Sequence, residues 1–309
     1  MNLVSQDSTP TLKTKENVRQ YLEQSVSHNT RRAYKSDLQH FVSWGGTIPC
    51  DDKMVTSYLA DHAQILSIAT LTRRLASISK AHTVKNMTSP TSSDLVKMTM
   101  RGIKRAHGKP QQRVSPILKE DLTAMLAHIQ PGNKGTRDKA LLLIGFAGAL
   151  RRSELSAITY TDLEFVAQGL KLNIPRSKTD QSGEGRIIGI PFGRGRVCPV
   201  KALKDWLCVS EIKSGPVFRS VKKGGAINPD RLSTRAIADI IKHYAFKTGL
   251  DPSKYSGHSL RAGLVTSAAQ NGISSWVIRR TTGHKSDAML FRYIRVGDLF
   301  LDNAAGALF

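Results

Sequence analysis

A polar stretch with two prolines, HGKPQQRVSP at residues 107–116, divides this chain into two parts. Proline lacks the amide proton that helices and central strands use, so such a stretch favours a connection between domains. The segments on either side are long and rich in regularly spaced apolar residues, and 309 residues suffice for about two domains. The sequence therefore predicts a linker over 107–116 and a second domain over 117–309.

The first domain is predicted to be a small helical bundle over residues 16–106, preceded by a flexible tail over 1–15. Segments 27–44, 69–85 and 92–107 have apolar residues at the spacing of one helix face. The positions expected to form these faces are Tyr34, Leu38, Phe41 and Val42, then Leu71, Leu75 and Ile78, then Leu95, Met98 and Ile103. Asp51 and Asp52, just after Pro49, are expected in a loop.

The second domain is predicted to be mainly α with a small antiparallel sheet near its start. Segments 163–175 and 184–191 are predicted as two strands, joined by the polar RSKTDQSG at 176–183. Helices are expected at 119–129, 136–150, 198–210, 233–249 and 258–272.

The charge of the chain points to a polyanionic partner. Lys and Arg number 46 against 24 Asp and Glu, a formal charge of +22, and both parts of the chain are basic. Such an excess opposes compaction, so nucleic acid is the first expectation and a membrane surface the second. The longest apolar run, 140–150, is too short to cross a bilayer, and the N-terminus lacks a signal-peptide core. Three cysteines without CxxC spacing favour a reducing cytoplasm.

Basic residues along the predicted helices of the first domain are candidates for contacts with double-stranded DNA. They are Arg31, Arg32, Lys35, Arg73, Arg74, Lys80, Lys85, Arg101, Lys104 and Arg105. The alternative is a solvated basic face, and the sequence does not distinguish residues that contact phosphates from residues that read bases.

Chemistry on a phosphodiester concentrates negative charge on oxygen, which metal ions or fixed cations stabilise. Acidic residues are few and no HExxH or DxDxD pattern occurs, so no metal or other cofactor is expected. The motif GALRRSEL, 148–155, places Arg151 where an apolar helix ends and another begins, with Glu154 close enough to orient it. A planar guanidinium binds two phosphate oxygens at once. The alternative is a helix-end salt bridge at the surface.

The motif SGHSLRAG, 256–263, offers a second cationic position. Ser256 is a plausible N-cap for a helix that begins near His258, which would place His258 and Arg261 one turn apart. The amides of a first helical turn also favour an anion. The alternative is a solvated helix start.

Two further segments carry candidate reactive groups. In TTGHKSDAMLFRYIRV, 281–296, Gly283 and His284 mark a turn or helix end, and Tyr293 follows nine residues later. A tyrosine becomes a useful nucleophile when cations stabilise its phenolate or a base removes its proton. Lys178, in the connection between the strands, is able to protonate a leaving oxygen. A core tyrosine and a solvated turn lysine are the alternatives.

Taken in order, GALRRSEL, SKT, HSLR, GHKS and FRYIR resemble the motifs of the tyrosine recombinase family, also called the phage integrase family, and look especially like its Cre-type members. The resemblance implies a helical core-binding domain and a catalytic domain that form a C-shaped clamp on DNA. It also implies a site-specific recombinase that cuts and rejoins strands through a 3′-phosphotyrosine without metal or ATP.

The resemblance also implies residue roles. Arg151 and Arg261 would bind the non-bridging oxygens of the scissile phosphate, with Glu154 supporting the arginines. His258 would assist proton transfer from Tyr293. The remaining two implied roles are protonation of the departing 5′ oxygen by Lys178 and a further hydrogen bond to the phosphate from His284.

An assembly is implied as well. A chain that is monomeric when free would form a tetramer on two DNA sites with inverted repeats, as part of the cytoplasmic nucleoid. The C-terminal segment 296–309, with Leu299, Phe300, Leu308 and Phe309, would dock on a neighbouring subunit or, alternatively, on its own domain. Two other functions remain open: a DNA-binding regulator without turnover and a type IB topoisomerase.

Overall fold

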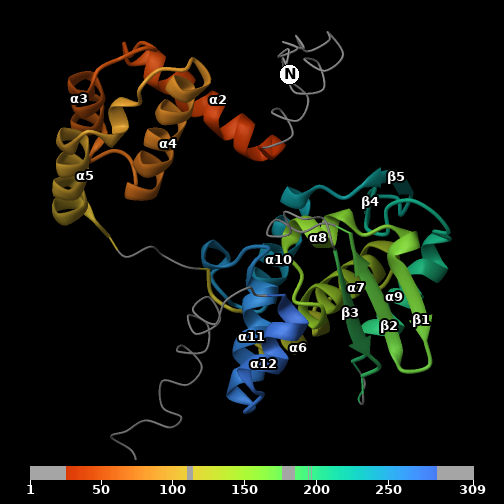
Figure 1. Ribbon diagram of the computed structural model, residues 1–309. Helices are drawn as coiled ribbons and strands as arrows, with labels where there is room; N and C mark the ends of the chain where they lie inside the picture. Colours follow the sequence, from red (N-terminus) through yellow and green to blue (C-terminus); the bar gives the residue numbers. More distant parts are fainter. Residues whose placement is uncertain (1–25, 110–113, 176–184, 194, 196, 284–309) are drawn as a thin grey trace, which may run out of the picture. The chain divides into compact units, whose positions relative to one another are not determined.

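The structure is a computed structural model of the chain, and it describes residues 26–109, 114–175, 185–193, 195 and 197–283 (Figure 1). The chain divides into two compact units, Met1–Gln111 and Gln112–Phe309. Within the described residues, helices predominate in both units and strands occur only in the second. None of the described helices is long and apolar enough to cross a membrane.

The described part of the first unit consists of helices α2 (His28–Ser43), α3 (Asp52–His62), α4 (Ile68–Val84) and α5 (Asp94–His107), with the short 3-10 helix η1 (Pro90–Ser92). Each α-helix begins after a residue whose side chain accepts an otherwise unpaired amide of the first turn. These residues are Ser27, Asp51, Ser67 and Ser93. The prediction of a loop at Asp51 and Asp52 is wrong, because Asp51 caps α3 and Asp52 is its first residue.

The core of the first unit confirms most of the predicted apolar faces but corrects the face of α5. Phe41, Leu71 and Ile78 are fully or almost fully buried, as predicted. On α5, by contrast, Leu95 and Met98 are 45% and 65% exposed. The buried stripe is instead Val96, Met100 and Ile103, so Ile103 is the one predicted residue of this face that is buried. Val42, also predicted to face the core, is exposed.

A polar cluster lies inside the first unit and includes two of the predicted DNA contacts. Asp37 is almost fully buried and accepts two 2.8 Å hydrogen bonds from Arg73 and one of 3.0 Å from Ser77. Arg74 does not lie on the surface: it is 9% exposed and donates to the Tyr58 hydroxyl at 2.6 Å. Its position beside Asp37 explains how a guanidinium is held in this core.

The described elements of the second unit are, in order, α6 (Lys119–Ala127), α7 (Asn133–Ala147), α8 (Arg152–Ala157), η2 (Tyr160–Asp162), β1 (Leu163–Val166), β2 (Gly169–Ile174), β3 (Arg186–Pro191), α9 (Pro199–Ser210), β4 (Arg219–Val221), β5 (Ile227–Arg231), α10 (Thr234–Lys247), η3 (Pro252–Lys254), α11 (Ser259–Gln270) and α12 (Ser275–Thr282). The five predicted helices correspond to α6, α7, α9, α10 and α11. Helix α8 is the helix expected to begin at the GALRRSEL junction, and Gly283, where a turn or helix end was expected, ends α12.

The sheets of the second unit are antiparallel and small. Strands β1, β2 and β3 form one sheet in that order, with Leu163 opposite Leu172 and Leu172 opposite Ile188. Segment 163–175 is therefore a hairpin rather than the single predicted strand. It turns at Ala167 and Gln168, just before Gly169, where φ is 151° and an added Cβ would lie 2.2 Å from the carbonyl oxygen of Ile190. The second sheet, β4 with β5, was not predicted.

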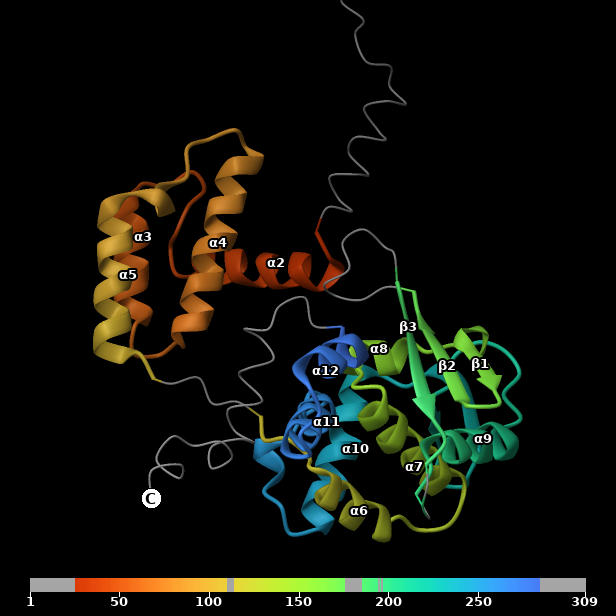
Figure 2. The same cartoon turned by 60° about the horizontal axis from the view of Figure 1, so that its bottom comes forward.

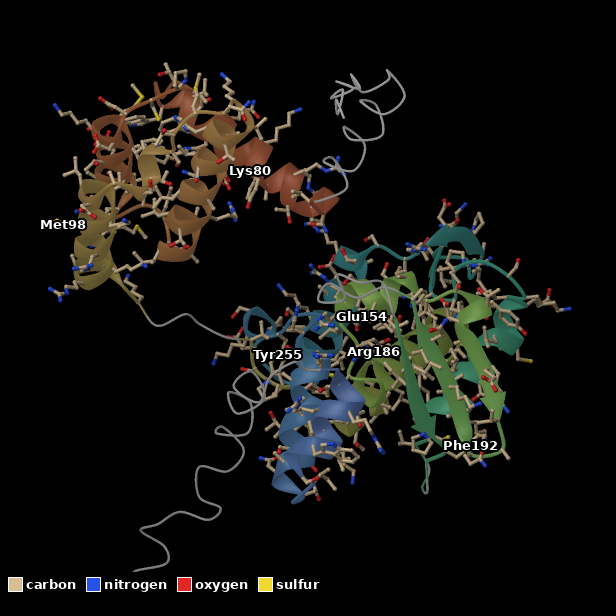
Figure 3. The ribbon with its side chains drawn as sticks, in the orientation of Figure 1. Lys80, Met98, Glu154, Arg186, Phe192 and Tyr255 are labelled. Atoms are coloured by element: carbon tan, nitrogen blue, oxygen red, sulfur yellow. The ribbon has the colours of Figure 1, made fainter. Side chains whose placement is uncertain are left out.

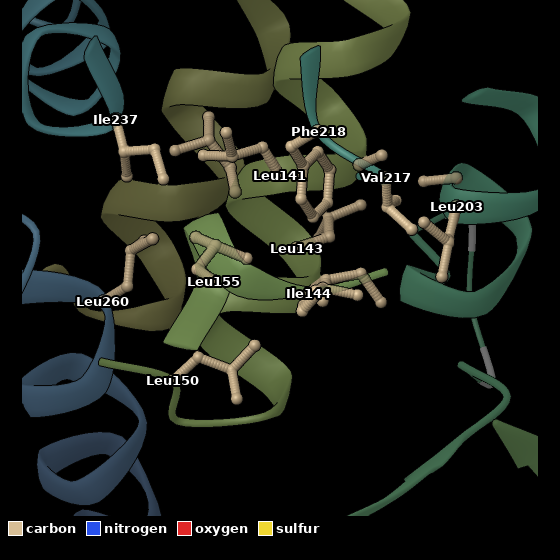
Figure 4. Close-up of a cluster of buried hydrophobic side chains, with 14 of the residues drawn as sticks. Leu141, Leu143, Ile144, Leu150, Leu155, Leu203, Val217, Phe218, Ile237 and Leu260 are labelled. Atoms are coloured by element: carbon tan, nitrogen blue, oxygen red, sulfur yellow. The ribbon is translucent and has the colours of Figure 1, made fainter. Parts of the chain in front are cut away.

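Helix α7 is the centre of the second unit's core (Figure 4). It packs against α9 on one side and α11 on another, and α9 in turn contacts β3 (Figure 2). Leu141, Ile144 and Leu143 on this helix are buried together with Leu155 and Leu260 from α8 and α11. This packing brings the end of α7, the whole of α8 and the start of α11 close to one another.

Candidate active site

The junction between α7 and α8 holds the first candidate arginine. Arg151 occupies the N-cap position of α8, and the carboxylate of Glu154 accepts two hydrogen bonds from it. One comes from the Arg151 amide at 2.9 Å and the other from its Nη1 at 2.6 Å. Glu154 is almost fully buried, with 2% of its side chain exposed, whereas Arg151 is partly exposed. The pair is thus an oriented guanidinium on a buried acid, as its spacing predicted.

A third residue shares this carboxylate and was not predicted. Arg186, the first residue of β3, donates from Nη2 to Glu154 at 3.0 Å (Figure 3). Its Nη1 donates to the carbonyl oxygen of Thr282, the last residue of α12. Arg186 is mostly buried. Its only signal in the sequence is a charged residue at the start of an apolar strand, a pattern too common to single it out.

The charges around Glu154 change its ionisation. Burial alone would raise the pKa of Glu154, but the hydrogen bond from the Arg151 amide and the positive charges of Arg186 and Arg151 outweigh it, so the pKa lies below its usual value of 4.5. The carboxylate is therefore ionised at neutral pH and holds the two guanidiniums, which would otherwise repel each other.

The second candidate arginine, Arg261, lies beside the same junction of α7 and α8, although 110 positions separate it from Arg151 in the sequence. Arg261 is buried in α11 and donates from Nη1 to the carbonyl oxygen of Ala149 at 2.7 Å. Ala149 belongs to the turn between α7 and α8, where it adopts a φ of 46°. The HxxR arginine is thus tied directly to the backbone that leads into Arg151.

His258 lies at the start of α11, beside the same junction. It occupies the N-cap position and is exposed. The prediction of Ser256 as the cap is wrong by two positions, because α11 begins at Ser259 and the Ser256 hydroxyl instead accepts from the His258 amide at 3.2 Å. Gly257 approaches Arg152 so closely that an added Cβ would lie 2.6 Å from that side chain. The HSLR and GALRRSEL motifs are therefore neighbours.

Comparison with known proteins identifies the family of the chain. The sequence profile of the phage integrase family matches residues 116–298, which is more than half of the chain. The chain belongs to the phage integrase family. This is the family of tyrosine recombinases, and its enzyme class is that of site-specific recombinases.

Individual relatives agree with the family assignment. The chain is 40% identical over 299 residues to an integrase/recombinase XerD homolog of Selenomonas ruminantium, covering 93% of this chain and 87% of the relative. It is 25% identical over 310 residues to recombinase Cre of Escherichia phage P1, covering 92% and 88%. The fold is shared with the Tn1549 transposon integrase in complex with transposon right end DNA, with a TM-score of 0.64 at 16% identity, covering 90% and 92%.

Three predicted site residues of this family member lie outside the described residues. They are Lys178, His284 and Tyr293. The C-terminal segment 296–309 and the tail 1–15 also lie outside them. The four remaining candidates, Arg151, Glu154, His258 and Arg261, come together at the junction of α7, α8 and α11. Among the described residues, no group of three or more His, Cys, Asp and Glu side chains is placed to hold a metal ion.

Most of the predicted DNA contacts lie on the surface of the first unit. Those exposed are Arg31, Arg32 and Lys35 on α2, Arg73 and Lys80 on α4, Lys85 just after it, and Arg101, Lys104 and Arg105 on α5. Arg73 is exposed but is also bound to Asp37 through two hydrogen bonds. Arg74 is the member of the predicted set that is buried.

Proposed function

We propose that this recombinase cuts and rejoins duplex DNA at a specific site through a covalent bond to Tyr293. The observation that supports this most strongly is the hydrogen bond from Arg261 to Ala149, because it joins two arginines from distant motifs at one place. Two guanidiniums at one site are suited to the non-bridging oxygens of a single phosphate. Glu154 orients one of them and neutralises part of the repulsion.

The proposed reaction is a transesterification. The phenolic oxygen of Tyr293 attacks the scissile phosphorus while His258 assists removal of its proton. The bond from phosphorus to the 5′ oxygen breaks, and Lys178 protonates that oxygen. Arg151, Arg261 and a hydrogen bond from His284 stabilise the charge that develops on the non-bridging oxygens. The products are a 3′-phosphotyrosyl link and a free 5′-hydroxyl.

Rejoining is the reverse reaction with a new strand. A phosphotyrosyl ester keeps the phosphodiester bond energy, so attack by another 5′-hydroxyl needs neither ATP nor another energy source. We propose no metal ion or other cofactor in this cycle, because fixed cations would supply the charge stabilisation.

The proposed partner is double-stranded DNA contacted by both units. A solved structure with the same fold holds transposon end DNA, and both parts of this chain are basic. We propose that the exposed basic residues of α2, α4 and α5 contact the duplex and that buried Arg74 stabilises the unit instead. A target with inverted repeats, a tetramer on two such sites, exchange of segment 296–309 between subunits and a cytoplasmic location complete the proposal.

The test is the capture of a covalent intermediate. A duplex that binds the full chain is selected from a randomised pool and then nicked near its centre, so that the short cleaved fragment diffuses away. The wild type should form an adduct that survives denaturation, and Tyr293→Phe should form none while binding the duplex as tightly. Tyr160→Phe, an exposed tyrosine of η2, is the control and should react like the wild type.

Two results would contradict the proposal. An adduct that persists in Tyr293→Phe would show that another residue attacks. Tight binding without any adduct in the wild type would indicate a regulator without turnover, and relaxation of supercoiled plasmid that lacks the selected site would indicate a topoisomerase.

A further inference from the structure

We propose that Arg186 is a positioning residue of the recombination site: it holds Arg151 in place through Glu154 and fixes the end of α12, the helix that leads into His284. This inference rests on the proposed function. Arg186 does not itself contact the DNA in this proposal. It acts by joining three segments of the chain that carry separate parts of the chemistry.

The contacts of Arg186 involve two different elements. Nη2 donates to Oε2 of Glu154 at 3.0 Å, the same oxygen that accepts the Arg151 amide at 2.9 Å. Nη1 donates to the Thr282 carbonyl oxygen. A single guanidinium thus spans from the first turn of α8 to the last turn of α12.

Only an arginine is suited to this position. Its two Nη atoms are held in a rigid plane, and each makes one of the two contacts, whereas a lysine has a single nitrogen on a flexible stem. Arg186 is mostly buried, and so is Glu154. A side chain that did not pair with Glu154 would leave the buried carboxylate with less positive charge beside it. Among the described residues, the Nε of Arg186 has no hydrogen-bond partner, so its polar contacts are these two.

The backbone of the neighbouring helix end is adapted to this side chain. Gly283 ends α12 with a φ of 68°, in the left-handed region that favours glycine. A Cβ at Gly283 would also lie 2.4 Å from Nη1 of Arg186. The next residue in the chain is His284. The conformation in which α12 ends is therefore coupled to the position of Arg186.

The place of Arg186 in the sheet links it to a third segment. It is the first residue of β3 and lies opposite Ile174, near the end of β2. The chain between these two partners contains Lys178. Arg186 thus closes the sheet at the base of the connection that carries the proposed general acid, while its side chain reaches the other two motifs.

The test compares cleavage with binding in the full chain. We use the selected, nicked duplex and measure the single-turnover rate of adduct formation and the affinity for the intact duplex. Arg186→Met and Arg186→Lys should each slow cleavage about 10- to 100-fold, because small misplacements of catalytic groups have effects of this size. The affinity for DNA should change by less than about 2-fold, because no contact with the duplex is removed.

A second substrate separates positioning from loss of structure. In a methylphosphonate duplex, a neutral methyl group replaces one charged non-bridging oxygen, so the reaction depends less on the charge of Arg151. If Arg186 acts by placing Arg151, its variants should regain most of the wild-type rate on this duplex. A general structural defect would slow both substrates equally.

The matched control is Arg219→Lys. Arg219 also joins two acceptors through its guanidinium, in this case the backbone carbonyls of Pro216 and Ser214, away from the site. It should cleave like the wild type. Thermal unfolding is measured for every variant, and Arg186→Lys carries the comparison if Arg186→Met does not fold.

Each outcome decides the matter. Slow cleavage with normal binding and recovery on the methylphosphonate supports the inference. Unchanged cleavage, or an equal loss on both substrates in folded protein, overturns it. Failure of the wild type itself to form an adduct overturns the proposed function, and the inference that rests on it, and so differs from failure of the Arg186 variants alone.

Discussion

Glu154 is a single residue with several electrostatic interactions. Its carboxylate accepts hydrogen bonds from one backbone amide and two guanidiniums, and it lies out of contact with bulk water. A buried charge is stable only when paired and hydrogen-bonded, and breaking such a pair leaves the partners uncompensated. Glu154 therefore stabilises the fold and the site at once, and its protonation should affect both.

Replacing Glu154 by Gln should give a pH-dependent loss of stability. The pKa of Glu154 is lowered in the folded protein, so its contribution is fully present above the unfolded value near 4.5 and is lost as pH falls through the lower folded pKa. We expect Glu154→Gln to lower the free energy of unfolding by about 3 kcal/mol at pH 7. The difference from the wild type should shrink below pH 4.5 in denaturant titrations.

The control for this prediction is Glu164→Gln. Glu164 of β1 pairs with Lys171 of β2 on the surface of the three-stranded sheet, where both side chains are at least half exposed. Surface pairs contribute at most about 1 kcal/mol, so this variant should differ little from the wild type. An equal loss at pH 7 and at pH 3 in Glu154→Gln would show that packing, and not the charge, is what matters.

Some of this site could be predicted from the sequence and some could not. Arg151 and Glu154 are three positions apart at the start of a helix, so local spacing was enough to pair them. Arg186 contacts Glu154 across 32 positions, and only the pairing of β2 with β3 brings it there. Sequence reasoning did not fix the register of that hairpin and therefore had no means of finding Arg186.

At the level of elements, α5 shows how two apolar stripes on one helix compete. Leu95 and Met98 are three positions apart and Val96 and Met100 four, and Ile103 fits either set, so spacing alone allows either stripe to face the core. The structure buries Val96, Met100 and Ile103, because α3 packs against this side of α5. No helix was predicted over 52–62, so the sequence offered no partner that would decide between the stripes.

The buried polar cluster between α2 and α4 should be essential to the first unit. Asp37 is held by Arg73, Ser77 and the nearby Arg74, and these contacts lower its pKa although burial acts to raise it. We expect Asp37→Ala to reduce the free energy of opening of α2 and α4 by about 3 kcal/mol, because two arginines lose their counter-ion. Hydrogen–deuterium exchange of peptides from these helices, in the full chain, should then be about 100-fold faster.

An exposed aspartate of the same unit provides the comparison. Asp94 pairs with Lys97 across one helical turn at the surface of α5, with 94% of its side chain exposed. Asp94→Ala should leave exchange in α2 and α4 nearly unchanged. Similar exchange in Asp37→Ala and Asp94→Ala would mean that the buried cluster does not stabilise these helices.

Over the whole molecule, a formal charge of +22 has to be reconciled with compact folding. Part of the answer is internal pairing, as for Arg73, Arg151 and Arg186, whose charges are met by Asp37 and Glu154. Other basic residues, among them Arg31, Arg32 and Lys80, lie exposed on the surface. Composition alone predicted a polyanionic partner, but the division of the arginines between internal pairs and surface positions required the structure.

The salt dependence of DNA binding should reveal which basic residues contact phosphates. Each phosphate contact releases a counter-ion, so log Kd should rise steeply with log salt concentration. We expect Lys80→Ala and Arg101→Ala each to reduce this slope by about 1 in titrations of the selected duplex. Lys53→Ala, an exposed lysine of α3 outside the predicted contacts, should leave the slope unchanged; an equal effect of all three would indicate only a loss of overall charge.

The closure of the sheet at Ile174 and Arg186 has a consequence for how relatives of this protein diverge. Insertions and deletions between these partners would leave the strand register intact, and each doubling of such a loop costs only about 0.6 kcal/mol. The lysine-bearing connection is thus free to drift in length during evolution. Arg186, at the downstream end of this connection, is not free to vary. Its pairing with Ile174, its hydrogen bond to Glu154 and its close approach to Gly283 all constrain it.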